Sequence, residues 1–540
     1  MTRTDPVTVE VIGSALASIV EEMGEALVRA SFSTNIKERR DCSTALFDRE
    51  GRTLCQAEHI PIHLGSFLDL IPEILARHPE AGMRPGDVFI GNDAYAGGGT
   101  HLPDIVLAEP VFVDGAIAAW AVNLAHHADF ADRGNAHIFQ EGLRIPPVRL
   151  YRAGELQQDV LDLILLNCQV PRERLSDLRA QMAANRLGVA RFQALCARYG
   201  AATVLAAGAA LMDYAERRMR AGIAAIPDGT YGFTDRHDSP EIAGELQLSV
   251  EVTVAGDAMR LAFDGPPQLR AGINMTRTAL LATVYYAVKA VVDPGIPPNA
   301  GLARPLSVTA PEGSVLSCRA PAAVNARLST CQRVVDLIMG ALAQAVPARL
   351  TGAHNGACSV AQFSGFQPGS SQPWAYLETI GGGFGARATK DGLDGVHVHA
   401  TNTSNLPVEA LETEYPLTLL AYELVDGSGG AGTWRGGMGL RRVYRAEAEC
   451  RVRLDTARLR SAPWGLAGGL PGGKARLEYG PGVEPFGLGG RGGLQPGQWV
   501  AVVTAGGGGF GPPAGRATAL VARDLVEGRL GAAEAETERG

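Results

Sequence analysis

The stretch DIVLAEPVFVDGAIAAWAVNLAHHAD, residues 104–129, decides how the first part of this chain folds. It holds two apolar runs joined by Asp114 and Gly115, and an Asp-Gly pair between apolar runs is a strong signal for a β-hairpin. A strict two-residue turn there places residue 104 opposite residue 125. Because proline has no backbone N–H to donate, Pro110 argues against a regular central strand.

The open end of this hairpin gathers side chains that bind divalent metals. His101 and Asp104 stand at its start, and His126, His127 and Asp129 stand at its end. Imidazole nitrogens and carboxylate oxygens together make a typical site for a divalent ion. The alternative interpretation is that these residues are polar ends of strands in a surface loop.

The strict register does not complete such a site. In that register His126 lies opposite Pro103, so it shares a face with His101 but not with Asp104. A β-bulge, or irregular backbone beyond the strand ends, is needed to bring Asp104 to the same face.

Composition limits the class of protein. At 540 residues the chain is too long for one core, so roughly two to four domains are expected. A net charge of −8, with no dense run of lysine or arginine, argues against nucleic acid as the main partner. The eight cysteines form no CxxC pair, which is typical of a reducing compartment. With no signal pattern and no long apolar segment, we expect a cytoplasmic protein without a membrane span.

The pattern along the chain predicts a mixed, multi-domain α+β fold. We expect an N-terminal metal-site domain (1–226) with helices and hairpins, a middle α/β region (227–350), and a glycine-rich, β-rich C-terminal region (351–540). Of 67 glycines, 32 lie between residues 380 and 515, which favours strands joined by tight turns there. Apolar periodicity predicts helices at 6–30, with Asp5 as N-cap, at 276–292 and 329–345, and two long helices within 173–222.

Motifs for nucleotide binding and for common hydrolases are missing. The strings GxxxxGK[ST], GxSxG and HExxH do not occur. GGGFGARATKDG (381–392) and AGGGGFGPP (505–513) are glycine-rich, but neither gives GxGxxG entering a helix. We interpret both as close-packed turns rather than phosphate cradles.

A series of strings with mixed glycine, polar and charged residues spans nearly the whole chain. They are NIKERRDCSTALFD (35–48), HIPIHLGS (59–66), GNDAYAGGGTHLPD (91–104), AHHAD (125–129), QEGLRIPP (140–147), SDLRAQMAANRLG (176–188), IPPNAGLARP (296–305), ETIGGGFGARATKDG (378–392), NTSNLPVEALE (402–412), GSGGAGTWRGGMG (427–439) and AGGGGFGPP (505–513). Together, and in the family's order, these strings resemble the hydantoinase B/oxoprolinase family. This family includes a subunit of ATP-dependent N-methylhydantoinases, the matching part of 5-oxoprolinases, and a subunit of acetone and acetophenone carboxylases.

The resemblance implies a metal-binding subunit of an ATP-dependent enzyme that opens a cyclic amide, a lactam or hydantoin ring. It implies that His101, Asp104 and His126 bind the metal, for which Mn, Zn and Fe all suit nitrogen and oxygen ligands. A partner, the hydantoinase A-type subunit, would carry the ATP site, so the protein is expected to be a hetero-oligomer. Two alternatives stay open: a subunit of an ATP-dependent ketone carboxylase, and a non-catalytic scaffold subunit.

Further residues are candidates for the chemistry around the metal. His63, His127 and Glu141 are candidate catalytic groups, with Glu141 as a general base. The alternative for His63 is a core histidine bonded to the backbone. Arg39 and Asp41 are candidates for substrate contact, since an arginine can hold a carboxylate or phosphate bidentately. His127 and Asp129 are also reserve ligands.

Overall fold

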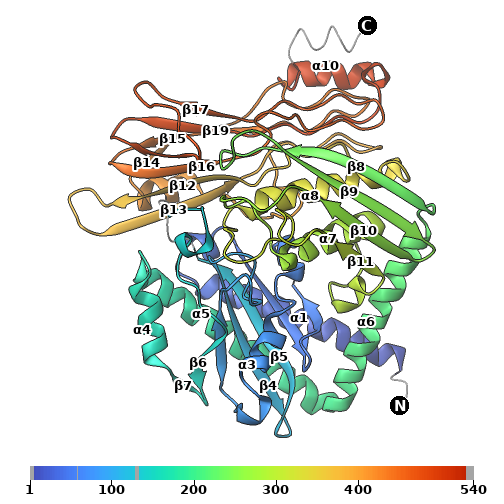
Figure 1. Cartoon of the computed structure of the whole chain (residues 1–540), viewed down its shortest axis with the longest axis vertical. Coiled ribbons are helices and arrows are strands. Elements are labelled where there is room, and N and C mark those ends of the chain that lie inside the picture. The colour runs from blue at the N-terminus through green and yellow to red at the C-terminus, as the bar shows by residue number, and fades with distance from the viewer. Residues whose placement is uncertain (1–4, 58, 128–132, 531–540) are drawn as a thin grey trace.

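The computed structural model describes residues 5–57, 59–127 and 133–530. It has an N-terminal lobe (α1 to α6), a middle lobe (β8 to α8) and a C-terminal lobe (β12 to α10). In Figure 1 the blue N-terminal lobe lies below, the orange and red C-terminal lobe lies above, and the green and yellow middle lobe lies beside both. Helices and mainly antiparallel sheets are mixed along the chain, so the predicted α+β class is confirmed.

A seven-stranded antiparallel sheet forms the N-terminal lobe, in the order β2-β1-β5-β4-β3-β6-β7. Helices α1, α5 and α6 pack on one face of this sheet, and α3 packs on the other. Its strands are β1 (Cys42–Asp48), β2 (Thr53–Gln56), β3 (Val88–Gly91), β4 (Asp104–Val113), β5 (Ala116–His126), β6 (Val148–Arg152) and β7 (Glu155–Leu156). Its helices are α1 (Pro6–Ala30), α2 (Thr34–Lys37), α3 (Leu70–Arg77), α4 (Gln158–Leu166), α5 (Pro171–Tyr199) and α6 (Ala201–Ala224).

The hairpin β4–β5 forms the centre of this sheet, and one extra residue changes its register. Asp114 and Gly115 both have positive φ, 50° and 81°, as a type I′ turn requires. After Phe112 pairs with Ile117, Val111 pairs with Ala119, so Ala118 is left over as a β-bulge. Asp104 therefore lies opposite His126, rather than opposite residue 125 as the strict turn predicts.

Pro110 lies within a central strand, so the prediction drawn from it was wrong. It pairs with Trp120 of β5, and β4 has β3 on its other side. The pairing of β3 covers only Val106 to Ala108, so at Pro110 the strand is paired on one side alone. Because no second strand needs an N–H there, the proline is tolerated.

The middle lobe is a four-stranded sheet, β11-β10-β9-β8, that packs against two helices. Its elements are β8 (Gly229–His237), β9 (Leu246–Ala255), β10 (Ala258–Asp264), α7 (Arg277–Val292), β11 (Leu306–Thr309) and α8 (Arg327–Leu342). The predicted helices α7 and α8 are confirmed, as are α1, α5 and α6. The Asp5 side chain caps α1 by accepting from the N–H groups of Val7 and Thr8.

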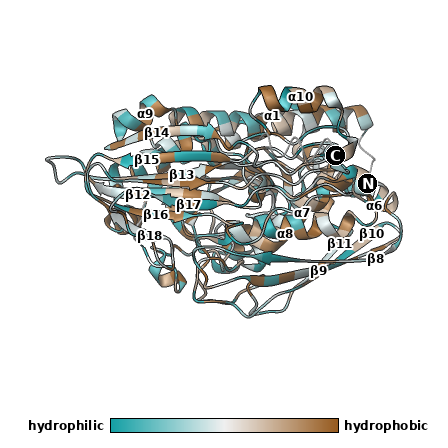
Figure 2. Cartoon of the chain, turned by 90° about the horizontal axis from the view of Figure 1, so that it is seen from above, coloured by the Kyte–Doolittle hydropathy of each residue, from teal (hydrophilic) through white to brown (hydrophobic). Residues whose placement is uncertain are grey.

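Two four-stranded sheets, β13-β12-β16-β18 and β14-β15-β19-β17, enclose the apolar core of the C-terminal lobe. Seen from above, they lie on one side of the molecule, and the middle lobe lies on the other (Figure 2). The elements are β12 (Ser359–Phe366), β13 (Pro373–Ile380), α9 (Val408–Glu414), β14 (Leu417–Leu424), β15 (Leu440–Ala446), β16 (Cys450–Asp455), β17 (Arg476–Tyr479), β18 (Arg491–Leu494), β19 (Trp499–Val503) and α10 (Thr518–Val526).

The glycine-rich strings are mostly not turns, which corrects the interpretation of 381–392 and 505–513. They run as extended segments that bond backbone to backbone outside the named strands. Gly437 donates to the carbonyl of Phe384 at 2.8 Å, and Gly507 donates to that of Gly437 at 2.8 Å. A Cβ on Gly507 would overlap the Phe384 carbonyl, so only glycine permits this approach. We call the packed segments 381–395, 427–439 and 505–513 the glycine bundle.

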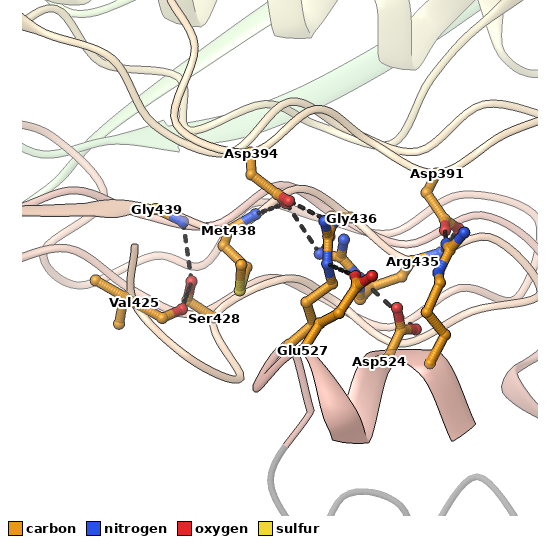
Figure 3. Close-up of polar contacts among 12 residues, drawn as sticks. Asp391, Asp394, Val425, Ser428, Arg435, Gly436, Met438, Gly439, Asp524 and Glu527 are labelled. Atoms are coloured by element: carbon orange, nitrogen blue, oxygen red, sulfur yellow. Dashed lines mark hydrogen bonds and ion pairs between the residues drawn. The ribbon is translucent and has the colours of Figure 1, made fainter. Parts of the chain in front are cut away.

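Buried ion pairs fasten α10 to the glycine bundle (Figure 3). Asp524 of α10 accepts two hydrogen bonds from Arg516, whose other terminal nitrogen donates to Asp391 at 2.8 Å. Arg435 donates to Asp394 at 3.1 Å. Because the carboxylates neutralise these buried guanidinium groups, the charges are tolerated inside the lobe.

Among the described helices, none alone has the length and apolar character to cross a membrane. Only α5 and α6 taken together meet those criteria, and they bend by 106° where they join.

Glu109 generates a prediction about stability. It lies in β4, and burial raises the pKa of its carboxyl from an ordinary 4.5 to about 7, against the nearby charge of Arg186. Because the pKa is raised in the folded state, burial of the protonated Glu109 carboxyl costs no charge desolvation at low pH. The protein loses stability as the pH rises through about 7 and the buried carboxyl ionises. We expect Glu109→Gln to raise the free energy of unfolding by on the order of 1 kcal/mol above pH 7, and to change it little near pH 5.

Chemical denaturation at the two pH values measures this effect. Glu155→Gln, at the exposed edge strand β7, is the matched control and should change stability at neither pH. An equal effect of Glu109→Gln at both pH values would contradict the electrostatic explanation.

Candidate metal centre and cavity

His101, Asp104 and His126 converge at the open end of the hairpin. Their possible ligand atoms all lie within 4.8 Å of one another, and all three residues are buried. Asp104 begins β4 and His126 ends β5, so the bulge at Ala118 is what places them directly opposite each other. We refer to these three residues as the triad.

The donor set of the triad fits a cation. The Nδ1 of His101 lies 3.3 Å from the backbone carbonyl and from the side-chain oxygen of Asn325, to which it can donate. Its Nε2 lies 3.1 Å from an oxygen of the Asp104 carboxylate. Burial, followed by the charge of Arg327, lowers the pKa of His101, which favours the neutral ring. A neutral imidazole nitrogen and the Asp104 carboxylate are both suitable donors to a divalent ion.

Arg327 and Thr100 hold the other oxygen of Asp104. Arg327 donates to it at 3.1 Å, and the Thr100 hydroxyl lies 3.3 Å from it. Burial alone would raise the pKa of Asp104, but the His101 ring and the Arg327 guanidinium outweigh burial and keep that pKa well below its usual range. Asp104 is therefore an ionised candidate ligand, and its carboxylate has a fixed orientation.

Asn35 of α2 holds the His126 ring. Its amide nitrogen lies 3.0 Å from Nδ1 and donates to the His126 carbonyl at 2.6 Å. Its amide oxygen accepts from Arg39. Arg39 also donates to the Leu377 carbonyl at 2.6 Å and to the Thr379 hydroxyl at 2.7 Å. Its guanidinium thus ties α2 to β13 and does not line the cavity described below.

Asp41 stands beside the triad. One of its carboxylate oxygens lies 4.0 Å from Nδ1 of His126, and the side chain lines the cavity. Burial raises its pKa to about 6, and the charge of Asp104 adds to this effect. Asp41 is therefore placed to contact a bound metal or substrate.

Both remaining histidine candidates line the cavity. The Nδ1 of His63 lies 2.8 Å from the hydroxyl of Ser43, a side chain rather than the backbone. Burial lowers the pKa of His63 to about 4, so it is neutral at neutral pH. The Nε2 of His127 lies 2.9 Å from the side-chain oxygen of Gln181 in α5, so this nitrogen already has a partner within the protein. Asp129 lies outside the described residues.

Glu141 lines the same cavity and keeps one oxygen without a partner. Its Oε1 accepts from the N–H groups of Val324 and Asn325, both at 2.7 Å. Its Oε2 is buried and has no hydrogen-bond partner. Burial raises the pKa of Glu141 to about 7, although the two backbone donors oppose this shift. Such a carboxyl exchanges a proton readily near neutral pH.

All three lobes line the cavity, whose volume is about 150 Å³. The N-terminal lobe supplies the triad, and the segment that leads into α8 supplies Asn325 and Arg327. The C-terminal lobe contributes one face of the sheet β13-β12-β16-β18. The sequence pattern did not reveal Asn325 or Arg327, which lie more than 220 residues after Asp104 in the chain. Asn35 falls within a string that resembles the family, but nothing in the string marks it as a partner of His126.

The triad generates a prediction about metal content. We expect the purified chain to bind a single divalent ion and His126→Ala to lose it. Asn35→Ala should weaken binding about 10- to 100-fold, because partners that orient a ligand contribute that much to affinity. Calorimetric titration with Mn²⁺ and Zn²⁺, after removal of metal with a chelator, measures the effect.

His78→Gln is the matched control, because His78 bonds to the Pro147 carbonyl outside the cavity. Equal metal content in His126→Ala and His78→Gln would exclude the triad as the binding site.

Comparison with known proteins places the chain in a family. Residues 5–513 match the family described as hydantoinase B/oxoprolinase. A Pseudomonas protein, provisionally named as the B component of a D-/L-hydantoinase, is 33% identical, and the match covers 100% of this chain and 95% of that protein.

Two solved structures share the fold. The ATP-dependent caprolactamase from Pseudomonas jessenii matches with a TM-score of 0.88 and 31% identity, over 98% of this chain and 94% of that one. The nucleotide-free acetone carboxylase matches with a TM-score of 0.89 over 99% of this chain and 79% of that one; at 20% identity this likeness concerns the fold alone. The chain belongs to the hydantoinase B/oxoprolinase family.

Proposed function

We propose that this chain is the metal-binding catalytic subunit of an ATP-dependent cyclic amidohydrolase. In this proposal it opens a lactam or hydantoin ring that a hydantoinase A-type partner has activated. The observation that carries the proposal is the convergence of the buried triad on the wall of a cavity, with the possible ligand atoms of two histidines and a carboxylate within 4.8 Å of one another. The caprolactamase relative, whose name specifies ATP-dependent action on a lactam, supports the same class.

Activation by ATP suits the chemistry of the bond. An amide carbonyl is a poor electrophile, and phosphorylation of its oxygen makes the carbon easier to attack. The sequence carries no GxxxxGK[ST] string and no GxGxxG string that leads into an α-helix, and two related proteins are named as one component of a larger enzyme. Both points support an ATP site on a partner subunit.

The triad residues would hold the cation, and Arg327 would keep Asp104 ionised and oriented. When bound, a divalent ion such as Mn, Zn or Fe polarises the oxygen under attack and lowers the pKa of water. Asp41 adjoins the same position and can contribute a further oxygen.

Glu141 is our candidate for the general base. Its unpartnered Oε2 is available to accept a proton from the attacking water, and a pKa near 7 matches that task at neutral pH. His63 would serve as a neutral hydrogen-bonding group on the cavity wall. Arg39 would position His126 through Asn35 rather than touch substrate.

We prefer hydrolysis over ketone carboxylation because of the sequence identities to the two solved structures. The caprolactamase shares 31% identity with the chain over nearly its whole length, whereas the acetone carboxylase shares 20%. The scaffold alternative leaves the arrangement of the buried triad unexplained.

Glu141 generates a prediction about pH. Because the base must be ionised, kcat/KM should fall as the pH drops below about 7. Glu141→Gln should lower kcat by about 10²- to 10⁴-fold and remove this acidic limb of the profile. Glu245→Gln, on the surface of the middle lobe, is the control. An acidic limb that persists unchanged in Glu141→Gln would assign the limb to another group.

Dependence on a partner generates a second prediction. The chain alone should not open a lactam ring in the presence of ATP, because it lacks a recognisable nucleotide site. Mixed with its hydantoinase A-type partner, it should gain turnover that consumes ATP and that His101→Ala abolishes. Coupled assays of ADP release and ring opening measure both. Efficient turnover by the isolated chain without ATP would contradict the two-subunit proposal.

A further inference from the structure

The wall of the cavity opposite the triad's own lobe is one face of the sheet β13-β12-β16-β18. The strand register places Gln362, Arg453 and Arg491 in one row across β12, β16 and β18. All three side chains line the cavity, as do Val360 and Asp455 in the next row. Two arginines therefore face each other directly across neighbouring strands, on the side of the cavity.

Such a pair needs an explanation, because like charges directly opposite each other destabilise a sheet. Arg453 is 4% exposed, so water does little to screen it. Its counter-charges are Glu241 and Asp455, and both contact the same terminal nitrogen, at 3.1 Å and 3.0 Å. The Nε of Arg453 is buried without a hydrogen-bond partner. The guanidinium thus keeps hydrogen-bonding capacity that the protein does not use.

Other groups add positive charge to the lining of the cavity. Helix α8 begins at the cavity without a side-chain cap, and a helix N-terminus carries partial positive charge. Burial raises the pKa of Asp455 to about 6 and that of Glu141 to about 7, so these acids supply less than full negative charge near neutral pH. The charged lining consists of arginines 133, 174, 327, 453 and 491 against carboxylates 41, 104, 141 and 455.

We propose that Arg453 and Arg491 form an oxyanion-binding subsite that holds a carboxylate or phosphoryl group of the substrate. A planar guanidinium presents paired N–H donors that match two oxygens of either group. Binding of the anion would offset the repulsion between the two arginines and satisfy the unused donor of Arg453.

The subsite would also orient the rest of the bound substrate. Glu141 interacts electrostatically with both Arg327 and Arg453, and it bonds to the backbone of Asn325, which contacts His101. A substrate anchored by its anion at the two arginines would thus direct its other end past Glu141 toward the triad. The identity of that other end as a ring carbonyl rests on the proposed function. The binding of an anion at the two arginines does not.

Binding to the full chain loaded with Mn²⁺ tests the subsite. The probes are L-5-oxoproline, which is a five-membered lactam with a carboxylate, 2-pyrrolidinone, which is the same ring without it, and inorganic phosphate. The test variant is Arg491→Gln. The matched control is Arg451→Gln, since Arg451 lies on the same face of β16 as Arg453 but is exposed and outside the cavity lining.

We expect at least one anion to bind the wild type and Arg451→Gln, and to bind Arg491→Gln at least about tenfold more weakly. Binding of 2-pyrrolidinone should be the same in all three. Preference for oxoproline over pyrrolidinone identifies a substrate carboxylate, whereas binding of phosphate alone identifies the phosphoryl group of an activated substrate. Failure of both anions to bind at millimolar concentration, or equal loss of charged and neutral probes in Arg491→Gln, would overturn the subsite.

Arg453→Lys provides a second variant, because it keeps the charge inside the ion network while removing the planar fork. It should fold, as judged by thermal melting, and lose anion affinity. A folded Arg453→Lys with wild-type affinity would assign Arg453 to structure alone. These measurements do not involve ATP or the partner subunit, so a failure of the subsite and a failure of the amidohydrolase proposal are separate results.

Discussion

The register of one hairpin is the constraint on which the site depends. Side chains alternate between the faces of a sheet, so a slip of one residue exchanges the faces. Without the extra residue at Ala118, Asp104 would face α5 while His126 faces the opposite side. With it, the carboxylate and the imidazole meet, while Asn123 and His127 extend to α5 and bond with Gln181. A single bulge therefore fixes both the triad and the packing behind it.

The rest of the site is held in place by contacts between lobes. The middle lobe fixes Asp104 through Arg327, and the C-terminal lobe fixes Arg39, which in turn fixes Asn35 and His126. These arginines are buried, so each needs several acceptors to offset the loss of hydration. The orientation of the triad consequently requires that all three lobes are folded and packed together.

Local signals predicted local structure well. The Asp-Gly pair located the hairpin, Asp5 and Pro6 located the start of α1, and apolar periodicity located the long helices. The proposed metal site required a β-bulge or irregular backbone. The position of the bulge could not be predicted, because the turn residues fix the register only near the turn. Arg327 and Arg453 could not be found, because their approach to the cavity depends on how sheets pack, which no short spacing encodes. The prediction from Pro110 was wrong because a proline disrupts a strand only where both neighbouring strands are paired with it. Here β3 ends before it reaches Pro110.

The glycine bundle gives its part of the C-terminal lobe a distinct response to temperature. Its segments lie so close that peptide groups, rather than apolar side chains, fill the space between them. Exposure of peptide groups on unfolding lowers the change in heat capacity, whereas exposure of apolar groups raises it. The middle lobe, with its large apolar core around α7 and α8, has the opposite balance. The stability of the glycine bundle therefore varies less steeply with temperature, and on cooling the middle lobe loses more of its stabilisation.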